Sequence, residues 1–387
     1  MKQRVDETQE ATFTDHPTQW PRNWRRRYSD NSRSNHRAAR HRTCHHTTNT
    51  ARIAEGQFYE AHQQLRVIAS RYVKAQDWEN ATSILHTGAL SLLQAGQGGS
   101  GGDLCIFLID VFNKGEVKSD ASSKGKLLGL LRAFPKDEPT KKKFVGEMIG
   151  WSAKYGEYPA GDPEIHHVAG SLYADGMLLT PPSHHHPPHL GLVLTQSIEL
   201  EPYEAERHLL LGSQDSPSTL ATLEYAWYEA DEPHTAPLYC ARGVLPYLLT
   251  GNLRAANKFF LLFTAFLSKK PGLNTQQIST SASDLRTYPT LPLLNFLGLL
   301  LRSVERGDPS LFRQLKSHYA TDLKEVNWNE ALDQLGEMYF GIKIPRQGNP
   351  MLDMLGGMFG GGGFGGGGGA KKSTGTKGIA PTAAGLD

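Results

Sequence analysis

Apolar residues recur through the central part of the chain at the three- and four-residue spacing of an amphipathic helix. The segment 58–72 carries them at intervals of 3, 4, 3 and 4, at Phe58, Ala61, Leu65, Ile68 and Tyr72. The same spacing returns in 81–92 and in 311–319. Patterns of strict alternation are scarce, and most prolines fall between the helical segments, where they begin or end helices. The pattern predicts an all-α fold over residues 51–345.

Three of the predicted helices begin with a similar short sequence. GQFYEA (56–61), QDWENA (76–81) and GNLRAA (251–256) each combine a turn residue, a large apolar residue two places on, and a closing alanine. A small residue at that last position lets a paired helix approach closely, as in tetratricopeptide-like hairpins. Because the full repeat signature is absent, the pattern favours an irregular α-solenoid, and an unrelated helical domain is the alternative.

Both ends of the chain lack this periodicity. Residues 1–50 hold ten Lys and Arg against five Asp and Glu, and eleven of the fourteen residues 356–369 are glycine. We therefore predict a disordered basic arm (1–50), a solenoid (51–345) and a Gly-rich disordered tail (346–387). A His- and Pro-rich insertion at 176–192 divides the solenoid into an N-terminal half (51–175) and a C-terminal half (193–345).

A short apolar segment precedes the glycine run, with side chains spaced for one or two amphipathic turns. Its apolar members are Met351, Leu352, Met354, Leu355, Met358 and Phe359. The segment indicates either a weakly ordered tail or a short docking motif.

Composition narrows the class of protein. With 41 Lys and Arg against 39 Asp and Glu, the net charge is +2, so a globally polycationic or polyanionic protein is excluded. The three cysteines lie far apart and form no CxxC pair, which suits a reducing compartment rather than a disulfide framework. The richest apolar runs are about ten residues long, short of the roughly 20 that span a membrane, and the N-terminus lacks a signal-type apolar stretch. We expect a cytosolic or nuclear protein.

The basic arm allows a second interpretation. Arg25, Arg26 and Arg27 follow Trp20 and Trp24, and basic charge with aromatic stacking suits nucleic acid or another anionic surface. No recognition fold accompanies these residues, so a disordered extension is the preferred interpretation.

The candidate catalytic motifs lack the sequence context that their chemistry requires. GGSGG (98–102) fits the spacing of a nucleophile elbow around Ser100, but a helical pattern rather than a strand precedes it. We interpret the run as a helix end and turn, with Asp103 as the N-cap of the next helix. It also lacks the Lys-Ser/Thr of a phosphate-binding loop.

The histidines are equally poor candidates for a metal site. His184, His185, His186 and His189 lie among prolines with no carboxylate or cysteine at ligand spacing, which favours a solvated loop. His166 and His167 are adjacent, so on a helix they point about 100° apart. No enzyme activity, cofactor or metal is expected, and a helical solenoid without catalytic residues usually provides a binding surface.

Several segments resemble one protein family in order along the chain. They are EAH at 60–62, GQGGSGGDL at 96–104, GDPEIHH at 161–167, EAERHLLLG at 204–212 and the segments 291–319 and 331–342. Together they resemble the scaffold subunit of the Golgi-to-ER traffic pathway, which delivers tail-anchored membrane proteins. The resemblance covers most of residues 51–360.

The resemblance implies a non-enzymatic helical solenoid that bridges two partners in the cytosol. In this family the N-terminal helices bind the targeting ATPase, and the C-terminal helices bind a ubiquitin-like adaptor that recruits a chaperone carrying the client. It implies neither membrane insertion nor nucleic-acid binding, and such bridging raises effective concentration.

Six polar residues in the matching N-terminal motifs are the expected ATPase-facing surface: His62, Arg66, Arg71, Lys74, Asp103 and Asp110. Charges on such a surface steer encounter and set orientation more than they add affinity. Without the resemblance the same charges indicate only a solvated helix face.

Ten apolar residues mark the expected adaptor-binding region: Leu293, Leu294, Phe296, Leu297, Leu300, Phe312, Tyr319, Leu335, Tyr339 and Phe340. They are too dense for one amphipathic stripe, so some pack in the core while others are free to line a groove. The sequence does not separate the two sets. Residues 269–290 stand where the family has a β-hairpin, although their Ser, Thr, Gln and Pro content makes that element uncertain.

The chain departs from the family pattern in two places. Only 50–55 remain recognisable of the helix that precedes EAH in the family, which puts the N-terminal site in doubt. The insertion at 176–192 divides a helical hairpin that the family keeps short.

Overall fold

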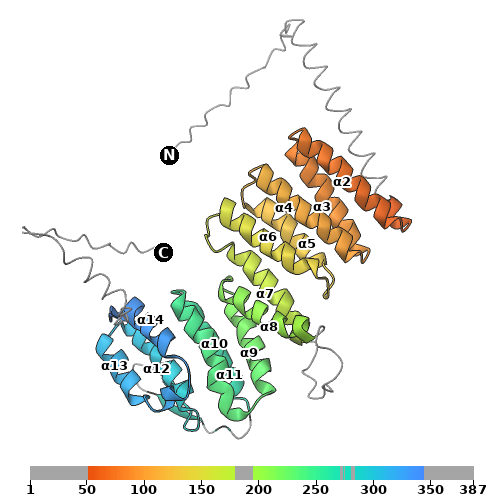
Figure 1. The fold of residues 1–387 in the computed structure, drawn as a ribbon. Coiled ribbons are helices and arrows are strands. Elements are labelled where there is room, and N and C mark those ends of the chain that lie inside the picture. The colour runs from red at the N-terminus through yellow and green to blue at the C-terminus, as the bar shows by residue number, and fades with distance from the viewer. Residues whose placement is uncertain (1–50, 179–194, 271–272, 274, 280–283, 344–387) are drawn as a thin grey trace, which may run out of the picture.

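The computed structural model describes residues 51–178, 195–270, 273, 275–279 and 284–343, and these form a row of packed helices (Figure 1). The arm, most of the His/Pro insertion and the Gly-rich tail lie outside the described residues. The first six helices are α2 (Phe58–Lys74), α3 (Trp78–Gln94), α4 (Gly98–Lys114), α5 (Ala121–Ala133), α6 (Thr140–Tyr155) and α7 (Pro163–Leu178).

Seven further helices continue the row: α8 (Thr195–Leu210), α9 (Ser216–Glu229), α10 (Ala236–Leu249), α11 (Leu253–Leu267), α12 (Pro292–Arg306), α13 (Pro309–His318) and α14 (Asn329–Phe340). Short 3-10 turns lie at Pro233–Thr235 and Asp322–Lys324. Helices pack either on their sequence neighbours, as α3 does on α2 and α4, or on the next helix but one, as α4 does on α6 and α9 on α11. The prediction of an all-α solenoid is confirmed.

The recurring helix-start sequence is a repeated turn. Its opening residue has a positive φ of 79° at Gly56, 55° at Gln76, 75° at Gly96 and 76° at Gly251. In each turn the next amide donates to a carbonyl five residues back, as Asp77 N does to Tyr72 O at 2.9 Å. This left-handed ending satisfies the last carbonyls of one helix and starts the next within three residues.

The segment GGSGG (98–102) belongs to this repeat, so the interpretation of these residues as a turn with Asp103 as the N-cap of the next helix was wrong. The turn is at Gly96, helix α4 begins at Gly98, and Asp103 lies inside the helix. Gly101 takes the position of Ala81, twenty residues earlier, and of Ala61, forty residues earlier. A Cβ atom at Gly101 would lie 2.7 Å from Leu93 Cγ, so close packing against α3 requires glycine here.

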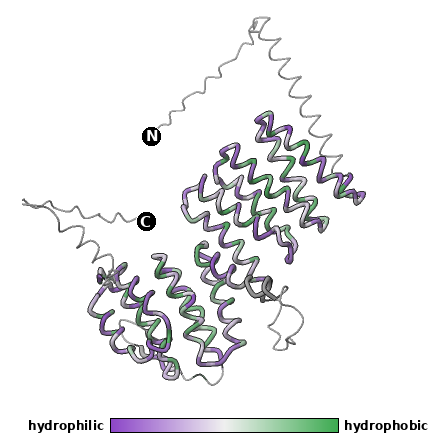
Figure 2. The backbone as a smooth tube through the Cα atoms, in the orientation of Figure 1, coloured by the Kyte–Doolittle hydropathy of each residue, from purple (hydrophilic) through white to green (hydrophobic). Residues whose placement is uncertain are grey.

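One continuous apolar core runs along the row from Leu65 to Phe340. Figure 2 shows apolar residues on the facing sides of neighbouring helices and polar residues on the outer sides. No helix among the described residues is long and apolar enough to cross a membrane.

A β-hairpin lies between α11 and α12. Strand β1 (Gln276–Ser279) pairs antiparallel with β2 (Asp284–Thr287), and Gln276 stands opposite Thr287. The hairpin expected within 269–290 is therefore present, and it places the end of β2 beside the start of α12.

Two buried polar clusters lie near the middle of the row. His166 on α7 and His208 on α8 are joined at their Nδ1 atoms, 3.0 Å apart. Arg242 on α10 pairs with Glu206 on α8 and with the fully buried Glu224 on α9, whose Oε2 lies 3.2 Å from Arg242 Nε.

Candidate protein-binding surfaces

A polar cluster joins α2 and α4 at the N-terminal end of the row. His62 Nε2 lies 2.8 Å from Asp103 Oδ2, and Arg66 donates to the same oxygen at 2.5 Å. His62 and Arg66 are one helical turn apart on α2, so both face a single carboxylate on α4. The Arg66 guanidinium also lies 5.9 Å from the ring centre of Phe107, one turn further along α4.

The charge of Asp103 is held in place by these partners. Partial burial raises the pKa of its carboxyl, but hydrogen bonds from His62 and Arg66 outweigh burial and leave the pKa below its usual value. The side chains of Arg66 and Asp103 remain 45% and 41% exposed. The cluster is therefore ordered and still accessible to a partner.

The six polar residues expected at this surface do not form one patch. Arg71 lies about 180° around α2 from His62, since each residue turns a helix by about 100°. Lys74 ends the helix, and both side chains are exposed. Asp110 lies two turns beyond Asp103 on the same side of α4, where it pairs with Lys114 at 2.6 Å. The structure brings together only His62, Arg66 and Asp103.

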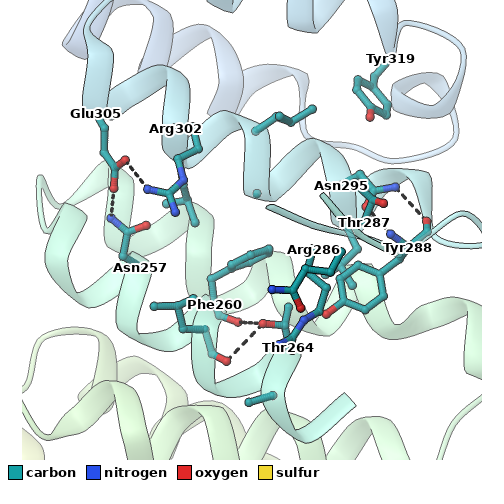
Figure 3. Close-up of a pocket in the computed structure, with 17 residues that line it drawn as sticks. Asn257, Phe260, Thr264, Arg286, Thr287, Tyr288, Asn295, Arg302, Glu305 and Tyr319 are labelled. Carbon is teal, nitrogen blue, oxygen red and sulfur yellow. Dashed lines mark hydrogen bonds and ion pairs between the residues drawn. The ribbon is translucent and has the colours of Figure 1, made fainter. Parts of the chain in front are cut away.

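A groove of about 530 Å³ opens near the other end of the row, between α11, the hairpin and α12 (Figure 3). Phe260, Leu261 and Thr264 of α11 form one wall, while Gly298 and Leu299 of α12 lie opposite. Leu261 is 62% exposed, although it lies in the most apolar part of α11. Apolar surface of this kind, open to solvent in a concave site, is typical of peptide recognition.

Three local contacts build the groove. Asn295 accepts from Tyr288 N and donates to Tyr288 O, both at 2.8 Å, and so fixes the end of the hairpin to α12. Arg286 of β2 donates to Ser268 Oγ at 3.0 Å and ties the hairpin to α11. A Cβ atom at Gly298 would lie 3.0 Å from Phe260 Cζ, so glycine allows the two helices to approach here.

Charged and amide groups border the apolar walls. Arg302 donates to Glu305 at 2.9 Å, and Asn257 Nδ2 donates to the other oxygen of Glu305 at 2.8 Å. Figure 3 shows this chain of contacts linking α11 with α12 at one side of the groove. The groove thus combines an apolar floor with a polar border that is able to fix the direction of a bound segment.

The structure separates the ten apolar residues expected at the adaptor site. Phe296, Leu297, Leu300 and Leu335 are fully buried core residues. Of the ten, only Leu294 and Tyr319 line the groove, whereas Phe312 lines a second cavity between α13 and α14. The remaining residues, Leu293, Tyr339 and Phe340, line neither cavity, and Tyr339 donates its hydroxyl to Leu248 O at 2.8 Å across to α10.

Sequence reasoning missed the α11 wall of the groove. The helix carries apolar residues on every side, from Phe259 to Leu267, although a surface helix normally has one apolar face. Buried Phe259 and Phe263 use one side for the core, which leaves Phe260 and Leu261 for the groove. That excess of apolar residues was the available signal.

The residues that the structure describes contain no group of three or more His, Cys, Asp or Glu side chains that could hold a metal ion. Ser100 lies within α4, and burial raises the pKa values of the Cys105 and Cys240 thiols. The histidines at 184–189 lie outside the described residues.

These features define the class of protein as a tetratricopeptide-like α-solenoid with two chemically different surfaces suited to protein binding. The family model of Golgi to ER traffic protein 4 matches residues 75–359. Golgi to ER traffic protein 4 of Aspergillus fumigatus is 50% identical over 326 residues, covering 80% of this chain and 88% of that protein. The chain belongs to the Golgi to ER traffic protein 4 family.

More distant relatives and a solved structure agree. The Schizosaccharomyces pombe protein of the same name is 29% identical, covering 78% of this chain and 91% of its own. The crystal structure of C. therm. Get4 matches with a TM-score of 0.70 and 49% identity, covering 83% of this chain and 96% of its own. Family membership assigns the chain a role in Golgi-to-ER traffic and the tail-anchored protein pathway. The family's name describes a traffic factor rather than an enzyme.

Proposed function

We propose that this chain is a non-enzymatic scaffold that bridges a targeting ATPase and a ubiquitin-like adaptor during cytosolic delivery of tail-anchored proteins to the ER membrane. The observation that carries the proposal is the presence of two unlike surfaces at separate ends of one continuous helical row. One surface is a charged cluster and the other an apolar groove, so each suits a different partner.

The ATPase is assigned to the cluster of His62, Arg66 and Asp103. A half-exposed Arg–carboxylate pair contributes little to folding, yet it presents fixed charges that orient an approaching partner. Asp110, Arg71 and Lys74 extend the charged surface but lie apart from the cluster, so we assign them a smaller effect.

The adaptor is assigned to the groove between α11 and α12. An extended or helical segment that buries its apolar side chains against Phe260 and Leu261 would cover the exposed part of α11. The adaptor in turn brings the chaperone that carries the client, and the bridge raises the local concentration of client near the ATPase.

The test is a double dissociation with the full chain and purified partners. Asp103→Lys should weaken ATPase binding at least ten-fold at low salt and leave adaptor binding unchanged, whereas Leu261→Asp should do the reverse. Met338→Asp is the matched control for Leu261→Asp, since Met338 is 51% exposed and lies outside the groove. Equal loss of both partners in either variant, or binding of neither by the unmodified chain, would contradict the scaffold.

A further inference from the structure

A second cavity lies between α13 and α14, beyond the groove described above. It encloses about 280 Å³ and has an apolar floor of Phe312, Leu332 and Gly336. Arg313, Lys316 and Lys343 stand around it. The volume is just below the roughly 300–1,000 Å³ of small-molecule sites, which suits a few side chains of a peptide. We call it the α13–α14 pocket.

The chain leaves its last helix directly over this pocket. Gly341 takes a left-handed φ of 61°, and Ile342 N donates to Gly336 O at 3.0 Å, which turns the chain back across α14. Ile342 then forms part of the pocket wall, and Lys343 lies at its edge. The next residues of the chain therefore start from the rim of an open apolar site.

The sequence that follows has the composition to fill it. After the seven residues 344–350 come Met351, Leu352, Asp353, Met354 and Leu355. Seven residues reach at most about 25 Å when extended, which is ample for a return to the rim from which they started. Methionine and leucine side chains are flexible enough to fill an irregular cavity.

The charges of the pocket and the segment are complementary. Lys316 pairs with Asp333 across the pocket, but no ion pair joins Arg313 or Lys343 to another described residue. Asp353 is the only acidic residue between Lys343 and the end of the glycine run. In this segment the carboxylate of Asp353 lies between two pairs of apolar side chains. It thus matches a cavity that has an apolar floor and, at its edge, two cations that form no ion pair with another described residue.

The extent of the family match supports a role for the same segment. The family model ends at residue 359, which is nineteen residues beyond the last helix (359 minus 340). It therefore includes the apolar segment and stops where the tract of residues 360–369 begins. The matched range therefore holds both the α13–α14 pocket and this apolar segment.

We propose that residues 351–355 dock within their own chain in the α13–α14 pocket, with Asp353 between Arg313 and Lys343. A short tether gives the segment an effective concentration in the millimolar range, so even weak intrinsic affinity keeps it bound. The docked segment covers the open end of the apolar core at the last helical pair. Solenoids need such a cover, because a terminal repeat has no neighbour on one side.

Hydrogen exchange on the full chain tests the docking. Backbone amides of 351–355 should exchange at least ten-fold more slowly than intrinsic rates, whereas those of 360–369 should exchange freely. Leu352→Asp should remove the protection, and Phe364→Asp, the same kind of change within the glycine tract, should leave it intact. Equal exchange of the two segments in the unmodified chain would overturn the proposal.

Disulfide trapping tests where the segment 351–355 docks. With Cys44→Ser in every variant, Asn349→Cys combined with Ser317→Cys at the pocket should form an intramolecular disulfide at least ten-fold faster than Asn349→Cys with Met338→Cys. Asp353→Lys should remove this difference, and adding Arg313→Glu should restore it. Equal disulfide rates for the two pairs would overturn the proposal. So would amide protection of 351–355 that appears only when the adaptor is bound. Protection that increases with protein concentration while the measured mass doubles would also overturn it, because the segment would then dock on a second copy of the chain.

Discussion

The N-terminal helices α2–α7 and the C-terminal helices α9–α14 pack by different means. In the first set small residues at repeated positions, Ala61, Ala81 and Gly101, bring aliphatic helices close together. In the second set aromatic rings fill the interior, as in the contacts of Phe263 with Tyr228 and Phe259. The groove described above lies in the second set, between α11 and α12, whereas the site in the first set is a cluster of charged side chains.

The two halves also differ in how they hold a cation between two carboxylates, and we expect the largest effect here. Arg242→Ala should lower the free energy of unfolding by about 3–5 kcal/mol, because it leaves the largely buried Glu206 without a counter-charge and removes the guanidinium from the ring of Trp227. Lys124 meets Asp162 and Glu164 at 3.1 and 2.8 Å in the N-terminal half, where Asp162 is largely buried but Glu164 is half exposed. Lys124→Ala should therefore cost less, about 2 kcal/mol in urea unfolding.

Burial explains this contrast. It raises the pKa of Glu224 to about 8, and the charge of Glu206 adds to the effect, while Arg242 opposes both. If Arg242→Ala and Lys124→Ala proved equally destabilising, the difference between the halves would not lie in their buried charges.

The next largest difference in stability between the halves should come from replacing glycines where two helices cross. A Cβ atom at Gly243 would meet three ring atoms of the fully buried Phe259, including Cδ1 at 2.7 Å. Gly243→Ala should destabilise the chain by about 1–3 kcal/mol, because a ring packed on both faces has nowhere to move.

The matched change in the N-terminal half is Gly88→Ala. Its Cβ would lie 2.7 Å from Leu65 Cδ1, at the end of a buried but rotatable side chain. Because moving Leu65 costs less than moving a buried ring and helix propensity returns about 1 kcal/mol, the net loss should stay below about 1 kcal/mol. Thermal unfolding of both variants measures the difference, and a large loss for Gly88→Ala would contradict it.

The seam between the halves should respond to pH. Burial lowers the pKa of His208 to about 4, and the neighbouring His166 adds to the decrease although Glu204 opposes it. His166 Nε2 donates to Ala160 O at 3.0 Å, so its Nδ1 accepts the proton of His208 Nδ1. This arrangement requires neutral rings.

An unfolded histidine binds its proton near pH 6.5, whereas folded His208 does so only near pH 4. The unfolded state therefore binds more protons between these values, and stability falls as the pH drops through that window. The loss should be about 2 kcal/mol between pH 7 and 4.5 by urea unfolding. His208→Gln should flatten this acid slope, and an unchanged slope would exclude the pair as its source.

The smallest effect on stability should come from the charged cluster itself. Asp103→Ala should change the free energy of unfolding by less than about 1 kcal/mol, because Asp103 and Arg66 are both nearly half exposed and solvent screens their pair. Asp110→Ala is the matched control on the same helix. A loss of several kcal/mol for Asp103→Ala would show that the cluster supports the fold rather than a partner.

Much of the fold was accessible from the sequence. The 3–4 spacing of Phe58 to Tyr72 predicted helix α2, and the motif order predicted the family. The interpretation of 98–102 failed because a glycine run is locally a poor helix former, and only the contact of Gly101 with Leu93 explains why a helix forms there. The position of Arg71 across α2 from His62 followed from helical geometry that the motif resemblance ignored.

By itself the sequence determined which segments become helices, because apolar periodicity and turn residues act over a few neighbouring positions. It also determined that the chain offers charge near one end and excess apolar surface near the other. Only the tertiary structure decided which apolar residues face solvent: Leu297 and Leu261 have the same side chain, yet one is buried and the other is 62% exposed. That choice depends on which helices pack together, as the contacts of Asn295 and Gly298 with distant residues determine.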